Sequence, residues 1–141
     1  MSGKAVLCLL ISIVSVATIV QGEFDDTCAR CLCHIQTNCN KNHPAGPYKI
    51  SWPYWADGGK PTVNGESPSS ETAFQNCVRD EKCNFDAVSG YMRNFEQDCD
   101  NDGHIQCIDY IKIHVFGGYG CTGDLPIHLQ KKYDDCLAGK V

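Results

Sequence analysis

The sequence is poor in basic residues and has no N-x-[ST] acceptor for N-glycosylation. Its 141 residues include 12 lysines and arginines against 17 aspartates and glutamates, which gives a net charge of −5 at pH 7. Proteins that bind nucleic acid or anionic membranes rely on clustered basic side chains. The charge balance therefore argues against both as partners, and against killing of bacteria by cationic attraction alone.

Long hydrophobic runs are missing beyond the N-terminus. The first 22 residues begin with a short polar stretch that contains Lys4, followed by an apolar run from Ala5 to Val20. This layout is typical of a secretory signal peptide, with cleavage after Gly22. The alternative is a membrane anchor, but the run is shorter than the ~20 residues that a bilayer span needs. We therefore expect a secreted, extracellular protein with a single domain over residues 23–141.

Cysteine, in contrast, is abundant. Cleavage would remove Cys8 from the 11 cysteines and leave an even number, which predicts about five disulfides in a small secreted domain. Zinc is the alternative for the Cys28-x-x-Cys31 spacing, but export into an oxidising compartment favours disulfides. The spacing does not give the connectivity. The cysteines concerned are Cys28, Cys31, Cys33, Cys39, Cys77, Cys83, Cys99, Cys107, Cys121 and Cys136.

Apolar periodicity and capping residues predict an α+β domain that is mainly helical, with at most a small sheet. Residues 40–62 alternate proline and glycine with aromatic residues, which favours irregular or short β structure. Residues 63–70 form a turn-rich loop. Helices are expected over residues 28–39, 71–79, 85–97, 107–116 and 126–138. Thr27 and Ser70 are the expected N-caps of the first two, and Gly117 and Gly139 end the last two.

Several spaced motifs occur in one order between Cys28 and Cys121. They are Cys28-x-x-Cys31-x-Cys33-x5-Cys39, Gly46-Pro47-Tyr48-Lys49-Ile50, Pro53-Tyr54-Trp55-x-Asp57-x-Gly59-x-Pro61, Ala73-Phe74-x-x-Cys77, Tyr91-Met92 and Ile113-His114-x-x-Gly117-Gly118-x-Gly120-Cys121. Together they resemble the invertebrate-type lysozymes, the destabilase family. The resemblance implies a lysozyme-like fold with a substrate cleft, no required cofactor, and hydrolysis of the β-1,4 bond of peptidoglycan. Some members are credited with an isopeptidase activity.

The resemblance also shows what this chain has lost. A glycosidase needs one carboxylic acid to protonate the leaving oxygen and a second carboxylate beside it. The family's acid is the glutamate of a C-x-C-x-x-E-S-G-C run, where this chain has Gln36. The family's second carboxylate lies in a stretch resembling C-x-M-D-x-G-S-L-S-C-G, where only residues 40–45 remain. Neither the aspartate nor the serine-rich turn that could serve an isopeptidase has a counterpart. Losing a general acid costs roughly 10²–10⁴-fold in rate, so we expect muramidase activity to be lost.

Binding of glycan is the activity that remains. Flat aromatic rings suit the apolar faces of sugars, and the predicted binding residues are Tyr48, Trp52, Tyr54, Trp55 and Asp57. The alternative for the aromatic residues is packing in the core. His114 is the one candidate for proton transfer, although a lone histidine is more often structural. We expect a monomer that binds peptidoglycan or a chitin-like glycan. The alternatives are an active lysozyme that uses substitute residues and an extracellular structural or interaction protein.

One further pattern resembles an EF-hand loop. Asp98, Asp100 and Asp102 occupy loop positions 1, 3 and 5, His104 supplies a backbone carbonyl at position 7, and Asp109 replaces the usual glutamate at position 12. The pattern marks a candidate for a structural calcium ion. The alternative is a loop held by disulfides, with its carboxylates facing water.

Overall fold

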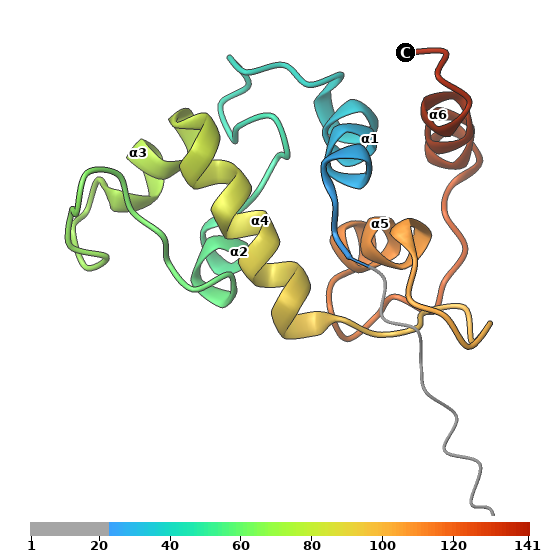
Figure 1. Ribbon diagram of the computed structural model, residues 1–141. Helices are drawn as coiled ribbons and strands as arrows, with labels where there is room; N and C mark the ends of the chain where they lie inside the picture. The colour runs from blue at the N-terminus through green and yellow to red at the C-terminus, as the bar shows by residue number, and fades with distance from the viewer. Residues whose placement is uncertain (1–22) are drawn as a thin grey trace, which may run out of the picture.

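The computed structural model describes residues 23–141 and is made of helices (Figure 1). Within this range no β-strand forms; the nearest to one is a single β-bridge residue, His104. The expected mainly helical fold class is confirmed, while the predicted signal peptide lies outside the described residues. None of the described helices is long and apolar enough to cross a membrane. The helices are α1 (Asp26–Thr37), α2 (Trp52–Asp57), α3 (Ala73–Arg79), α4 (Glu81–Phe95), α5 (Cys107–Phe116) and α6 (Ile127–Leu137).

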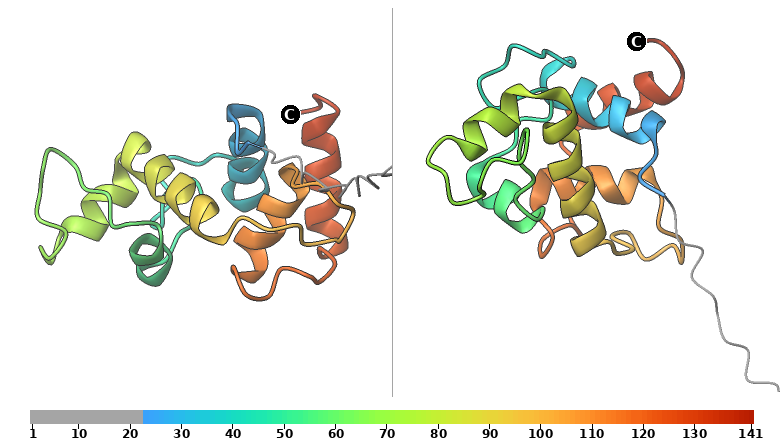
Figure 2. Two further views of the ribbon diagram at one scale, coloured as in Figure 1. Left: turned by 60° about the horizontal axis from the view of Figure 1, so that its bottom comes forward. Right: turned by 60° about the vertical axis from the view of Figure 1, so that its left-hand side comes forward.

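The helices form two groups that meet at α4 and α5. Helix α4 packs against α2, α3 and α5, while α1 packs against α5 and α6. Figures 1 and 2 show α2, α3 and α4 on one side of the molecule and α1, α5 and α6 on the other. The largest fully buried side chains come from both groups, so one core runs through the domain; they include Trp55, Met92, Leu32, Ile111 and Ile113.

Side-chain caps explain where several helices begin, and they correct the sequence predictions. Asp25, not Thr27, caps α1 by accepting a hydrogen bond from the Cys28 amide (2.7 Å). Asp80 caps α4 through the Cys83 amide (2.8 Å), so this helix begins at Glu81 rather than at Phe85. It ends at Phe95 rather than at Gln97.

The predicted start of α3 is also wrong. Ser70 does not cap this helix: its hydroxyl donates to the Glu66 carboxylate (2.7 Å) and accepts from the amide of Thr72 (3.3 Å), which itself precedes the helix. The hydroxyl of Thr72 donates to the same carboxylate (2.6 Å). The helix therefore begins at Ala73 rather than at Glu71. Helix α2 was not predicted at all, although Ser51 caps it and Pro53 lies in its first turn.

All ten described cysteines pair into five disulfides, which confirms the predicted framework and leaves none of them for zinc. Two of these disulfides tie α1 to the chain's second half, and the other three close shorter loops. The pairs are Cys28–Cys107, Cys31–Cys136, Cys33–Cys39, Cys77–Cys83 and Cys99–Cys121.

Helix α4 crosses the end of α2 at two glycines that touch through their backbones. A β-carbon added at Gly90 would lie 2.0 Å from the Gly58 carbonyl oxygen, and one added at Gly58 would lie 2.3 Å from the Ala87 carbonyl oxygen. Neither obstacle is a flexible side chain. The close approach of the two helices therefore depends on both glycines.

We expect Gly90→Ala to lower the free energy of unfolding by roughly 3 kcal/mol or more. The backbone clash outweighs the gain of about 1 kcal/mol in helix propensity. Chemical denaturation measures the change. The matched control is Gly123→Ala, whose new β-carbon would meet only Phe116 ring atoms at 3.7 Å, an ordinary contact. Equal stability of the two variants would contradict a tight crossing at Gly90.

Candidate functional site

Gln36 lies in the last turn of α1, on a helix that the disulfides hold rigidly. The bridge from Cys28 fixes this helix to α5, the one from Cys31 fixes it to α6, and the Cys33–Cys39 bridge closes its C-terminal end. The side chain of Gln36 is partly exposed. The structure thus presents an amide, which has no acidic proton to donate, from a helix held by disulfides. That this is the position of the family's acid stays a prediction of the sequence.

The short segment after α1 folds back over α4 without a carboxylate. The Thr37 hydroxyl donates to the Pro47 carbonyl (2.6 Å), which holds the two ends of the segment together. Gly46, with a φ of +72°, lies directly on Asn84, because a β-carbon here would meet the Asn84 amide nitrogen at 2.5 Å. The intervening residues are Asn40, Lys41, Asn42, His43, Pro44 and Ala45. They provide no acidic partner for a reaction at Gln36.

His114 has both of its ring nitrogens engaged. One, Nε2, lies 2.9 Å from the Tyr48 carbonyl oxygen, and the other, Nδ1, lies 2.8 Å from the Tyr54 hydroxyl. Because a carbonyl can only accept, Nε2 carries the proton, and Nδ1 accepts from Tyr54. Burial lowers the pKa of His114 to about 4, against the opposing effect of its bond to Tyr48. The imidazole is therefore neutral and locked, an arrangement that ties α5 to α2.

The locked histidine predicts a pH dependence of stability. In the unfolded chain the imidazole takes up a proton below about pH 6.5, whereas in the folded chain it does so only near pH 4. Its contribution to stability is therefore fully present above pH 6.5 and is lost as the pH falls toward 4. As the pH is lowered from 7.5 to 4, the melting temperature of His114→Gln should fall less steeply than that of the original protein. Identical slopes would contradict a buried, neutral imidazole.

The predicted sugar-binding aromatic residues divide between core and surface. Trp55 is 1% exposed and donates its indole N–H to the Pro61 carbonyl (2.8 Å), so it offers no face to a ligand. The ring of Tyr54 stacks on Tyr91, with centroids 3.8 Å apart. Trp52 is 53% exposed, and the Lys60 ammonium lies 5.3 Å from its ring centroid. Of this set, Trp52 has the ring surface to meet a sugar.

Asp57 and Tyr48 lie in different surroundings. Asp57 is exposed at the end of α2, and its backbone carbonyl accepts a hydrogen bond from the Asn94 side chain (2.7 Å). Tyr48 is largely buried, and burial raises the pKa of its hydroxyl to about 12, with smaller contributions from Glu81 and Asp26. The hydroxyl is therefore a neutral donor at any physiological pH.

Tyr48 lines a groove of about 610 Å³ between α1, the segment after it, and the start of α4. Ala29, Tyr48 and Phe85 give the groove apolar surface, and the rings of Tyr48 and Phe85 lie 6.5 Å apart. Charged side chains of both signs surround this surface: Asp26, Arg30, Glu81 and Lys82. An apolar floor with a polar rim suits a sugar, whose ring faces are apolar and whose edge carries hydroxyls.

Apart from Tyr48, the groove residues named above were missed by sequence reasoning. Asp26, Ala29, Arg30 and Cys33 follow one another at helical spacing along α1, which is the signal that could have indicated a common face. The residues from α4 could not have been found, because their position depends on how α4 packs beside α1.

The acidic loop brings together three of the five predicted calcium ligands. Carboxylate oxygens of Asp98, Asp100 and Asp102 lie within 4.8 Å of one another. Asp98 accepts hydrogen bonds from the Gly103 amide (2.9 Å) and the Asp102 amide (3.3 Å), and such backbone bonds lower its pKa. His104 is exposed, and its amide donates to Asp102 (2.8 Å).

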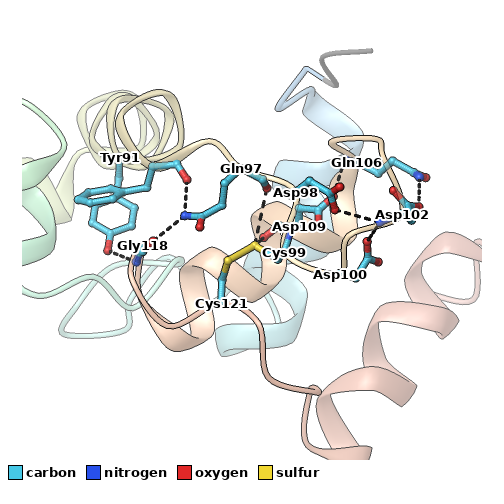
Figure 3. The surroundings of a disulfide bond; sticks show 11 residues. Tyr91, Gln97, Asp98, Cys99, Asp100, Asp102, Gln106, Asp109, Gly118 and Cys121 are labelled. Carbon is cyan, nitrogen blue, oxygen red and sulfur yellow. Dashed lines mark hydrogen bonds between the residues drawn. A yellow bond between two sulfur atoms is a disulfide. The ribbon is translucent and has the colours of Figure 1, made fainter. Parts of the chain in front are cut away.

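Asp109 has a different role from these three (Figure 3). It is 1% exposed, and its carboxylate accepts from the amides of Cys99 (2.8 Å) and Gln106 (2.7 Å). Burial raises its pKa. Asp109 therefore caps α5 and holds the loop at Cys99, which itself bridges to Cys121. A calcium ion on the three remaining carboxylates stays a prediction of the sequence.

Comparisons with known proteins agree with this architecture. The Destabilase family model matches residues 25–136. A lysozyme of Magallana gigas is 29% identical over 126 residues, covering 80% of this chain and 82% of that protein. Invertebrate-type lysozyme 2 of Caenorhabditis elegans is 28% identical over 118 residues, covering 77% and 84% respectively.

Two solved structures share the fold. A chain in the crystal structure of Aeromonas hydrophila PliI in complex with Meretrix lusoria lysozyme superposes with a TM-score of 0.62 at 19% identity, covering 81% of this chain and 92% of that chain. The crystal structure of Tapes japonica lysozyme superposes with a TM-score of 0.57 at 21% identity, covering 79% and 87%.

Proposed function

The chain belongs to the Destabilase family of invertebrate-type lysozymes, and we propose that it is a secreted member that binds peptidoglycan or a related glycan without cutting it. The observation that carries the proposal is Gln36, an amide on a disulfide-held helix, where the sequence resemblance places the family's acid. The carboxylate-free segment that follows supports it. Five disulfides and the apolar N-terminal run support secretion.

The groove beside α1 is the proposed glycan site. The Tyr48 hydroxyl would donate a hydrogen bond to a sugar oxygen. It stays neutral, and none of residues 23–141 accepts a hydrogen bond from it. Phe85 and Ala29 would contact the apolar face of a sugar ring. Arg30 supplies positive charge for the carboxylates of peptidoglycan, whereas Lys82 already pairs with Asp86 (2.5 Å). Trp52 is the second proposed contact, through its exposed ring.

We expect Tyr48→Phe to weaken retention on insoluble peptidoglycan by roughly 2–10-fold, the value of one net hydrogen bond. The ring and its packing remain, so the fold should be unaffected. The matched control is Tyr133→Phe, which removes another buried hydroxyl from α6, outside the groove. Retention of both variants at the original level would exclude Tyr48 as a contact. If neither peptidoglycan nor chitin retains the protein, the result would instead favour the alternative of an extracellular interaction protein.

An active hydrolase is the second candidate, because two carboxylates, Asp26 and Glu81, line the same groove. Glu81, however, is 68% exposed and pairs with Lys41 at 2.7 Å. A general acid is normally kept protonated by a desolvating pocket, and neither side chain is buried. The groove therefore favours binding over catalysis.

A further inference from the structure

The chain between α2 and α3 forms a loop at the edge of the molecule (Figure 1), and Asn64 and Gly65 form an exposed turn within it. Both residues have left-handed φ angles, +52° and +72°, and the Glu66 amide donates to the Val63 carbonyl across them (3.0 Å). This is the φ pattern of a type I′ turn, for which Asn-Gly is a preferred pair. None of these residues lines the groove beside α1, so the turn is separate from the proposed glycan site.

The backbone amide of Gly65 is free to react. Among residues 23–141 no group accepts a hydrogen bond from it, and none bonds to the side chain of Asn64. Apart from its two neighbours in the chain, no described residue lies within 4 Å of the position that a Gly65 β-carbon would take. The structure thus places an unblocked amide nitrogen directly after an unblocked carboxamide.

Asn101 resembles Asn64 but lacks the free amide after it. It is exposed and has a left-handed φ of +59°. The next amide along the chain, that of Asp102, donates to the carboxylates of Asp98 (3.3 Å) and Asp100 (3.2 Å). A bonded amide is less able to lose its proton and turn toward the asparagine side chain, and the side chain of Asp102 hinders the approach. Asn101 is therefore an internal control.

We propose that Asn64 is a site of spontaneous deamidation. The Gly65 nitrogen loses its proton to water or hydroxide and attacks Cγ of Asn64, and the side-chain amino group leaves as ammonia. The new N–C bond closes a five-membered succinimide, which water then opens to aspartate or isoaspartate. The attack is intramolecular, which gives it a high effective molarity, and glycine has no β-carbon to hinder it. Each product adds one negative charge.

The carboxylate of Glu66 gives the modification a structural consequence. It accepts hydrogen bonds from the hydroxyls of Ser70 (2.7 Å) and Thr72 (2.6 Å) and from the Asn76 side chain (2.9 Å), and so ties the loop to the start of α3. Isoaspartate runs the backbone through its side chain and adds one carbon to it, which breaks the turn bond of the Glu66 amide. A protease should therefore cut residues 63–70 several-fold faster in the isoaspartate form.

The test is incubation of the disulfide-intact protein in warm, mildly alkaline buffer, followed by peptide mapping with tandem mass spectrometry. Asn64 should gain about 1 Da, since OH replaces NH₂, and should do so at least roughly tenfold faster than Asn101. The rate should rise with pH, because base removes the proton of the attacking amide. Asn64→Gln should abolish the mass gain over the same period, since the longer side chain closes a ring much more slowly.

A folded protein in which Asn64 gains no mass would overturn the proposal; reduced and alkylated protein, incubated beside it, shows that the conditions suffice. Equal rates at Asn64 and Asn101 would overturn it as well. The isoaspartate form, separated by ion exchange, is then compared with the unmodified protein by limited proteolysis with subtilisin. Equal rates of cleavage within residues 63–70 would contradict the loss of the turn bond.

Discussion

Replacing both Cys31 and Cys136 by alanine is expected to lower the free energy of unfolding by about 5 kcal/mol. This bridge joins residues 105 apart in the sequence, the largest separation of the five. Breaking it restores the most conformational freedom to the unfolded chain. It also releases α6 from α1, the helix that positions Gln36. A loss of this size is comparable to the whole net stability of many small domains.

The matched control is the double replacement of Cys33 and Cys39 by alanine. The disulfide between these two cysteines joins residues only 6 apart in the sequence. The same chain-entropy relation gives about 2 kcal/mol for this bridge. Guanidinium denaturation of both variants at pH 7 measures the difference. Losses of equal size would contradict a stabilisation that grows with the length of the closed loop.

Much of the helical fold could be predicted, because periodicity and caps are local signals. The range of α5 was predicted correctly, since apolar residues recur along it and Gly117 ends it with a φ of +84°. Helix α2 was missed because its proline and aromatic residues favour irregular structure, although Ser51 and Pro53 are helix-start signals. The disulfide pairing could not be predicted, since it depends on how α1 packs against α5 and α6.

The candidate site was less predictable than the fold. The replacement of the family's acid by Gln36 is a prediction that the cysteine spacing of the sequence makes by itself, and it stays a prediction. The sequence does not show which aromatic residues are exposed. Trp52 and Trp55 differ only by their place on α2, and the orientation of this helix depends on tertiary contacts. Asp109 shows the same limit: its spacing fits a calcium ligand, but burial turns it into a cap for two backbone amides.

The second prediction with a large expected effect concerns the rate of peptidoglycan hydrolysis. We expect lysis of peptidoglycan at a rate at least roughly 10²–10⁴-fold below that of an active invertebrate-type lysozyme, because the sequence resemblance places an amide, Gln36, where the family has its general acid. Gln36→Glu should not restore activity. The variant regains an acid, but the segment from Asn40 to Ala45 still has no second carboxylate to stabilise or attack the sugar cation. Both requirements must be met together.

The most direct measurement is the clearing of a peptidoglycan suspension by the purified, disulfide-intact protein and by Gln36→Glu, followed as turbidity. Reduced and alkylated protein is the negative control, and an active invertebrate-type lysozyme is the positive control. The account predicts no clearing above the negative control by either protein, together with retention of the original protein on the sedimented peptidoglycan. Clearing by the original protein would show that other residues carry out hydrolysis, and would contradict the proposal that it binds glycan without cutting it.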